Sequence, residues 1–127
     1  MLRPIPQSLL GDMMMLKVCI GMDAWQNPSW QEYTVQNVHI QNTNEVKKTK
    51  ENTEVVLRSI LFIDSRRSTP LLDYDALAEQ SQKAGKPLRC VVYNSNGQKY
   101  GEYEVLTVDP VPDVPATRIH HIELGLV

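Results

Sequence analysis

The strongest strand signal in this 127-residue chain is the run EVVLRSILFID, Glu54–Asp64. It is apolar on both faces apart from Arg58 and Ser59, which is typical of a central strand covered on both sides. The segment Ser65–Pro70 that follows contains two serines, a threonine and a proline, and it ends the strand. We therefore expect one long buried strand near the middle of the chain.

Two further strands are expected before this one. Met13–Ile20 places apolar residues on one face by alternation. Trp30–Thr43 alternates too, but its phase slips by one residue near Gln36–Asn37, which indicates a β-bulge. The intervening Gly21–Ser29 is rich in turn-forming residues and is expected to be a loop. Asn44–Thr53, NEVKKTKENT, is polar and is expected to project as a loop or hairpin tip.

One helix is expected, over Asp73–Ala84. Asp73 or Asp75 can cap its first turn, and Gly85 followed by Pro87 ends it. A weak apolar stripe at helical spacing runs along one side. The helix is therefore an addition to a chain whose other signals are those of strands.

The last third of the chain predicts a hairpin and a final strand. Leu88–Asn94 and Lys99–Val108 flank Asn96-Gly97, a dipeptide that favours a tight hairpin turn. Asp109–Ala116 contains three prolines and is expected to be an extended connection without ladder hydrogen bonds. Thr117–Val127 is the final strand, with one face that carries His120, Ile122, Leu124 and Leu126.

Together these signals predict an all-β fold: a small antiparallel six-stranded β-barrel with one short helix and a long projecting loop. Closure of the sheet removes exposed strand edges, which a small chain can hardly cover otherwise. With 127 residues, 42% of them hydrophobic, one core is feasible and two are not. We expect a single barrel domain over residues 13–127, preceded by an N-terminal arm over residues 1–12.

Composition and charge exclude several classes of protein. A formal net charge of −2 gives no global basic field for nucleic acid or membranes. Cys19 and Cys90 each lie in an apolar run and are expected to be buried free thiols. No secretory signal or apolar run of membrane-spanning length is visible. We therefore expect a protein made and used in a cytoplasm, or built into something assembled there.

No catalytic, metal or cofactor site is expected. His39 lies mid-strand, and the adjacent His120 and His121 would point to opposite faces of a strand, so they could not share a metal ion. Glu102 and Glu104 share a strand face, where paired carboxylates are usually a solvated surface. The chain is expected not to be an enzyme and to need no cofactor.

Two charged segments could contact a partner. Lysines cluster in the polar stretch Asn44–Thr53, where flanking glutamates leave it nearly neutral. This stretch is either a solvated tip or a loop that touches nucleic acid or a partner subunit. Arg66 and Arg67 could pair with acidic side chains of another subunit, although surface solvation would also explain them. The residues concerned in the polar stretch are Lys47, Lys48, Lys50, Glu51 and Asn52.

Several stretches together resemble one known family. Arg3-Pro4-Ile5-Pro6 opens the chain before the first strand, Asp23–Pro28 reads DAWQNP before the second, and HHIELGL follows Pro110 in the last. Their order and spacing resemble those of the minor capsid proteins of tailed phages and prophages of Gram-positive bacteria. The chain departs from that pattern at Asp73–Pro87, where a helix and Gly-Lys-Pro stand in place of the family's Gly-Asp turn.

The resemblance implies a structural protein of the phage neck, a head-completion or stopper subunit. Such subunits form a ring of about twelve copies below the portal and its adaptor. The ring closes the DNA-filled capsid and provides the surface on which the tail docks. The implied candidate residues of the DNA channel are Lys47, Lys48, Lys50, Glu51 and Asn52. The implied location is the virion, assembled in the host cytoplasm, with contact to double-stranded DNA without sequence specificity and none to membranes. The expected contact residues for subunits or partners are Arg3, Pro4, Ile5, Pro6, Trp25, Arg66 and Arg67.

Two alternatives stay open. One is a neighbouring ring protein of the neck, a tail-completion or tail-terminator subunit, since these share small β-rich folds. The other is a small β-barrel that binds nucleic acid or peptide. It would use a stacking face formed by Tyr93, Tyr100 and Tyr103 on or beside one hairpin.

Overall fold

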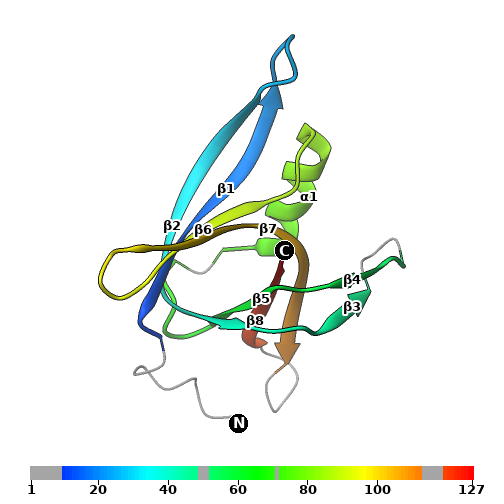
Figure 1. Cartoon of the computed structure of the whole chain (residues 1–127). Helices are drawn as coiled ribbons and strands as arrows, with labels where there is room; N and C mark the ends of the chain where they lie inside the picture. The colour runs from blue at the N-terminus through cyan, green and yellow to red at the C-terminus, as the bar shows by residue number, and fades with distance from the viewer. Residues whose placement is uncertain (1–9, 49–51, 71, 113–118) are drawn as a thin grey trace.

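The computed structural model describes residues 10–48, 52–70, 72–112 and 119–127. Eight strands and one helix lie within these ranges (Figure 1). In chain order they are β1 (Asp12–Met22), β2 (Pro28–Asn42), β3 (Val46–Lys48), β4 (Glu54–Val56), β5 (Ser59–Asp64), α1 (Tyr74–Ala84), β6 (Arg89–Tyr93), β7 (Lys99–Pro112) and β8 (Ile119–Leu126).

Six of the strands form a closed antiparallel barrel in the order β1-β2-β5-β8-β7-β6. β3 and β4 pair with each other as a separate two-stranded hairpin that leaves the barrel sideways in Figure 1. The β1–β2 hairpin also extends well beyond the barrel, with α1 beside it. The expected all-β fold, a six-stranded antiparallel barrel with one short helix, is confirmed.

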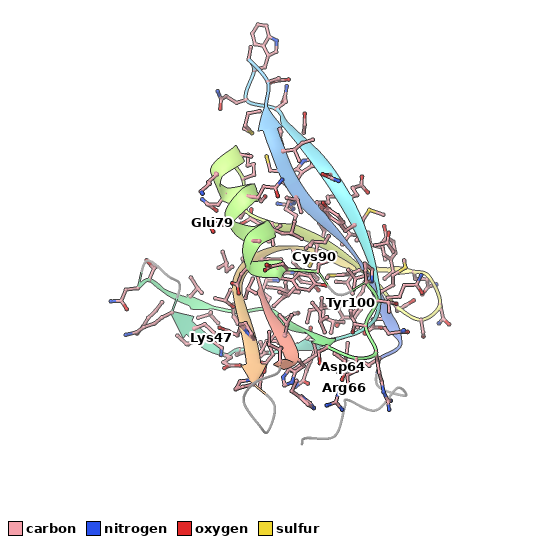
Figure 2. All side chains as sticks on the ribbon, turned by 180° about the vertical axis from the view of Figure 1, so that it is seen from behind. Lys47, Asp64, Arg66, Glu79, Cys90 and Tyr100 are labelled. Carbon is pink, nitrogen blue, oxygen red and sulfur yellow. The ribbon has the colours of Figure 1, made fainter. Side chains whose placement is uncertain are left out.

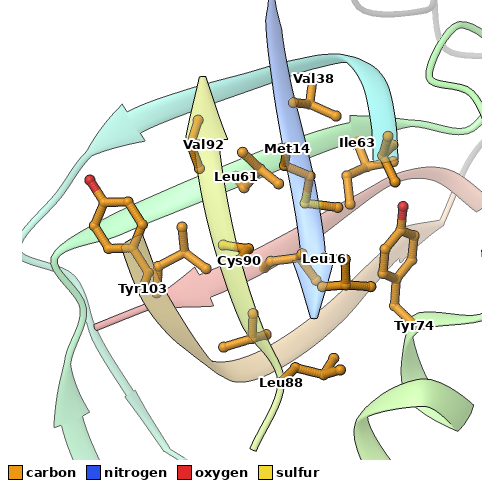
Figure 3. Packing of buried hydrophobic residues seen from close by; sticks show 14 of the residues in the cluster. Met14, Leu16, Val38, Leu61, Ile63, Tyr74, Leu88, Cys90, Val92 and Tyr103 are labelled. Carbon is orange, nitrogen blue, oxygen red and sulfur yellow. The ribbon is translucent and has the colours of Figure 1, made fainter. Parts of the chain in front are cut away.

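Aliphatic side chains from alternate strand positions fill the barrel. Met14, Leu16 and Val18 of β1 are buried, while Lys17 between them lies half-buried on the outer face. Figure 3 shows how side chains from several strands meet in one cluster with Tyr74 of α1 at its edge. Cys19 and Cys90 are free and buried, as the apolar runs around them predict.

The predicted β-bulge in β2 is confirmed at Asn37. Asp12 pairs with Val38, whereas Met13 pairs with Gln36, so Asn37 is an extra residue in β2. Its φ of 60° lies in the left-handed region, which Asn tolerates better than most residues. From Val38 onward β2 pairs with β5. The bulge therefore lies where β2 changes neighbours and bends around the barrel.

The prediction of one continuous strand over Glu54–Asp64 is wrong, because the chain changes partners at Leu57 and Arg58. The Leu57 N–H donates to the carbonyl of Glu45 in the β3–β4 hairpin at 2.9 Å, and the Arg58 N–H donates to the carbonyl of Leu126 in β8 at 2.8 Å. β4 thus belongs to the hairpin and β5 to the barrel. The only sequence sign of the break is the polar pair Arg58-Ser59, because the residues on either side of it are apolar on both faces.

The expected extended connection at Asp109–Ala116 is also corrected. β7 continues to Pro112, with Asp109 paired to Glu123 and Pro110 paired to Ile122 of β8. Two prolines two residues apart lack their N–H groups on the same strand edge. β6 pairs with β7 only as far as Glu104, so beyond that residue one edge of β7 has no neighbouring strand. The prolines can face this edge, and the other edge keeps its ladder hydrogen bonds to β8.

The local turn predictions are confirmed. α1 begins after Asp73, whose Oδ1 accepts from the Ala76 N–H at 3.2 Å, and it ends at Gly85 with a φ of 123°. In the Asn-Gly hairpin, Gly97 has a φ of 78°. The Asn94 side chain accepts from backbone N–H groups within the same turn. Each of these signals depends on only a few consecutive residues.

Candidate interaction surfaces

The β3–β4 hairpin carries an exposed apolar pair. Val46 and Val56 are direct partners, and they are 56% and 59% exposed. Because Leu57 donates to Glu45, these two valines form the next, non-hydrogen-bonded pair, in which side chains approach most closely. A groove of about 400 Å³ lies at the base of the hairpin, between it and the end of β2.

Two of the candidate DNA-channel residues, Lys47 and Lys48, lie in β3 of this hairpin, and Asn52 precedes β4. Lys47, labelled in Figure 2, has its Nζ 3.2 Å from Glu45 Oε1 and 3.7 Å from Asp109 Oδ2 of β7. The hydrogen bond to Glu45 is the main cause of a raised Lys47 pKa, and desolvation opposes it. The charge of Lys47 is therefore compensated by carboxylates of its own chain. Lys48 and Asn52 are exposed, while Lys50 and Glu51 lie outside the described residues.

A tight turn closes the long β1–β2 hairpin and presents Trp25. The loop expected over Gly21–Ser29 is shorter than predicted, because β1 continues to Met22 and β2 begins at Pro28. Asp23 Oδ1 accepts from the N–H groups of Trp25 at 2.8 Å and Asn27 at 2.9 Å. The turn is thus internally bonded, while the Trp25 side chain is 84% exposed.

Arg66 and Arg67 lie in the turn after β5. Figure 2 shows Arg66 at the end of the barrel opposite the β1–β2 tip. Their backbone N–H groups donate to Asp64 Oδ1 at 2.8 and 3.0 Å. Asp64 is fully buried, so its carboxylate shapes this turn. The Arg66 side chain is exposed and that of Arg67 half-buried.

Most of the expected N-terminal arm, including Arg3, Pro4, Ile5 and Pro6, lies outside the described residues. Leu10 is only 2% exposed, and β1 begins two residues later. The chain is therefore already packed against the barrel at this point.

The outer face of β2, β1, β6 and β7 carries a row of charges. Glu32, Lys17, Arg89 and Glu104 are successive cross-strand partners. Glu32 with Lys17 and Arg89 with Glu104 are pairs of opposite charge, which stabilise a sheet modestly, whereas Lys17 and Arg89 are like charges directly across strands, which is unfavourable. Arg89 Nη1 lies 3.3 Å from Glu104 Oε1 within this row.

Glu102 lies among three cations on the same face. Its carboxylate is 3.9 Å from Lys17, 3.6 Å from Arg89 and 3.5 Å from Lys99. Desolvation raises the pKa of Glu102, but the three cations together outweigh it and lower the pKa. The carboxylate is therefore held ionised as part of a charge network.

A groove of about 350 Å³ adjoins this network. Pro28, Trp30 and Pro87 form its apolar walls, and Lys86 lies beside them. Within the described part of the chain, Lys86 takes part in no ion pair. No spacing in the sequence links these residues, because strand pairing and the end of α1 bring them together.

His120 and His121 lie together, which corrects the prediction that they point to opposite faces. Their Nδ1 atoms are 2.8 Å apart, and His121 Nε2 is 3.0 Å from Glu123 Oε2. The cause is a bulge in β8, where Val111 pairs with His121 but Pro112 with Ile119. The extra residue turns two consecutive side chains toward one side. Among the described residues, no three His, Cys, Asp or Glu side chains are arranged to hold a metal ion.

The three tyrosines do not form one stacking face. Tyr103 points into the core at 5% exposure, with the Arg58 guanidinium 5.0 Å from its ring centre. Tyr100 is exposed, and its hydroxyl lies 3.2 Å from Asn42 Oδ1. Tyr93 is half-buried on β6. The three tyrosines therefore do not provide the stacking face expected of a small barrel that binds nucleic acid or peptide.

Comparison with known proteins adds no relative: no protein-family model, curated protein or solved structure matches this chain. The described residues include no helix long and apolar enough to cross a membrane.

Proposed function

We propose that this protein is a structural subunit of the phage neck, a head-completion or stopper protein that assembles as a ring between the portal–adaptor and the tail. The observation that carries the proposal is a short hairpin, β3–β4, that projects from a closed barrel. A stopper needs a stiff body for the ring and a segment that reaches the channel. The barrel supplies the first and the hairpin the second.

The hairpin is braced where it leaves the barrel. Thr43 N–H donates to the Arg58 carbonyl at 3.0 Å, and Leu57 N–H donates to the Glu45 carbonyl at 2.9 Å. The ion pair between Lys47 and Asp109 adds a link to β7. An isolated two-stranded hairpin is marginally stable in water. These links support a projecting position that the hairpin alone would not maintain.

The mechanism we propose is steric. In a ring of about twelve copies, each hairpin points into the lumen, and together they narrow the channel so that packaged DNA cannot leave. Pairing of Lys47 with Glu45 and Asp109 suits this role. Dense unpaired lysines would hold phosphates tightly and with strong salt dependence. The contact with DNA needs no sequence specificity.

The proposal requires no catalytic group and no cofactor. Its partners are further copies of the chain, the portal and adaptor on one side, tail or neck proteins on the other, and packaged DNA in the lumen. The protein would be assembled in the host cytoplasm and retained in the virion. A neighbouring neck, tail-completion or tail-terminator ring could use a similar body, and the position of the subunit in a map of the neck separates these.

Deletion of Lys47–Asn52 tests the proposal. The purified variant should form the same rings as the parent chain by negative-stain microscopy. Phage that carry the deletion should package DNA and then lose it, measured as nuclease-sensitive DNA and empty heads. A matched control replaces Glu79 and Lys83, an exposed ion pair on α1, with alanine, and it should retain DNA. Normal DNA retention after the deletion would refute the plug.

A further inference from the structure

The tip of the β1–β2 hairpin is built as a rigid, exposed anchor. Besides the two bonds to the Asp23 carboxylate, Asp23 N–H donates to the Asn27 carbonyl at 3.0 Å, and Gln26 N–H donates to the Asp23 carbonyl at 3.1 Å. A side chain on a bonded turn loses little further backbone freedom when it binds a partner. Trp25, 84% exposed at this tip, is also the residue type most enriched among binding hot spots.

The same chain carries a groove suited to an indole ring. Trp30, Pro28 and Pro87 supply apolar walls in a space of about 350 Å³, and the rest of its lining is charged: Lys17, Lys86, Arg89, Glu102 and Glu104. Lys86, without an ion pair among the described residues, supplies a cation at the rim. A cation beside an aromatic face is favourable. Cys19, the cross-strand partner of Trp30, lies on the same face and is fully buried, with its N–H bonded to Ser81 of α1, so the helix covers the sheet beside the groove.

We propose that Trp25 of one copy inserts into the groove formed by Pro28, Trp30, Lys86 and Pro87 of a neighbouring copy. The inference rests on the proposed ring function and deepens it by naming both halves of a subunit contact. Asp23 beside Trp25 gives the tip a negative charge, which complements Lys86 at the rim. Both native thiols, Cys19 and Cys90, are buried, so they should not form disulfides in a cross-linking test of this contact.

A second copy is the occupant because anchor and groove are different patches of one chain. Such a heterologous contact repeats from copy to copy and closes into a ring when the rotation allows it. The exposure of Trp25 shows that it does not fill the groove of its own chain. A buried tryptophan removes roughly 150–250 Å² of surface from water, a central share of a small contact.

Disulfide trapping between two different variants tests the contact. Chain with Ala24→Cys, an exposed neighbour that keeps Trp25 in place, is mixed with chain carrying Lys86→Cys and oxidised mildly, and linked dimers are scored on non-reducing gels. The mixture should give a strong dimer band, and each variant alone should give little. Glu79→Cys, at an exposed position on α1, replaces Lys86→Cys as the matched control and should not cross-link. Trp25→Ala should also weaken self-association at least tenfold, measured by sedimentation.

The outcomes separate this contact from the proposed function. Rings that form without an Ala24→Cys to Lys86→Cys link would overturn the contact and leave the stopper proposal standing. A strong link in particles that never close into rings would support the contact and count against the stopper. A chain that stays monomeric at every concentration and gives no link would overturn both. Tyr100→Ala, at an exposed aromatic on another hairpin, should leave association unchanged.

Discussion

The side-chain amide of Asn37 donates a hydrogen bond from Nδ2 to the carbonyl oxygen of Arg67 at 3.0 Å. This bond joins the bulge in β2 to the turn after β5. Gln36 and Thr69 exchange two backbone hydrogen bonds beside it, at 2.8 and 3.2 Å, and Ser68 Oγ donates to the Asn37 carbonyl. Bulge and turn are thus one bonded unit, at the point where β2 changes partners in the barrel.

Asn37→Val should therefore lower the free energy of unfolding by about 2–4 kcal/mol. A β-branched residue at positive φ costs about 1–3 kcal/mol, and loss of the hydrogen bond to Arg67 costs about 1 kcal/mol. Asn37→Gly can adopt the positive φ without strain, so it should lose only the hydrogen bond to Arg67, about 1 kcal/mol. Urea unfolding of both variants measures the difference. Equal destabilisation would show that the positive φ is not the main constraint.

Ser81→Ala should destabilise the attachment of α1 to β1. Ser81 is fully buried, and its Oγ accepts from the Cys19 N–H at 2.9 Å and donates to the Lys86 carbonyl at 2.7 Å. Removal of the hydroxyl takes away the hydrogen-bond partner of the Cys19 N–H and of the Lys86 carbonyl. This should lower the free energy of unfolding by about 1–3 kcal/mol. Amide exchange at Cys19 should accelerate with the loss of stability. Gln80→Ala, exposed on the same helix, should change stability by less than about 0.5 kcal/mol.

Gly125→Ala should overpack the contact between β8 and its neighbours. A Cβ there would overlap Thr107 Oγ1 and come within 2.9 Å of Leu57 Cδ1. Overpacking of this kind costs about 1–3 kcal/mol. Gly21→Ala is the matched control, since a Cβ at that position would meet no atom within 4 Å. Thermal unfolding should show a lower Tm for the first variant only, and equal Tm values would contradict the crowding at β8.

Stability should fall as the pH rises above about 8.5, in part through Cys90. Burial raises the pKa of its thiol to about 12, against about 8.5 in an unfolded chain. The folded state therefore holds this proton more tightly, and its contribution is complete below about pH 8.5 and lost toward pH 12. Cys90→Ala should flatten the decline between about pH 9 and 10, by up to about 1.4 kcal/mol per pH unit. An unchanged slope in urea unfolding at these pH values would exclude Cys90 as a cause.

Sequence patterns predicted elements well where the information was local. The Asp73 cap, the Asn96-Gly97 turn and the bulge near Asn37 each depend on a few consecutive residues. The errors arose where a distant partner decides. The chain breaks between β4 and β5 because Leu57 and Arg58 bond to different sheets, and β7 continues through Pro110 because β8 lies along it.

The candidate surfaces follow the same division. Trp25 stands out in the sequence as an aromatic residue in a turn, and the structure places it at an exposed tip. Lys47 stands out as one of several lysines, but its pairing with Asp109 joins residues far apart in the chain. The groove beside Trp30 and Lys86 has no sequence signal at all, because it forms only when a strand and a helix end meet.

Sequence patterns alone predicted the barrel strands in outline, the position of the helix, and closure of one apolar core by a small antiparallel sheet, but not β3, the break between β4 and β5, or the continuation of β7 to Pro112. Alternation with period two and short capping motifs are properties of neighbouring residues, so they can be identified in the sequence without knowledge of the structure. Only the tertiary structure decided which strands pair, where a hairpin leaves the barrel, and that His120 and His121 share one side of β8. These features depend on the register between distant strands, and a shift of one residue reverses the face that each side chain occupies.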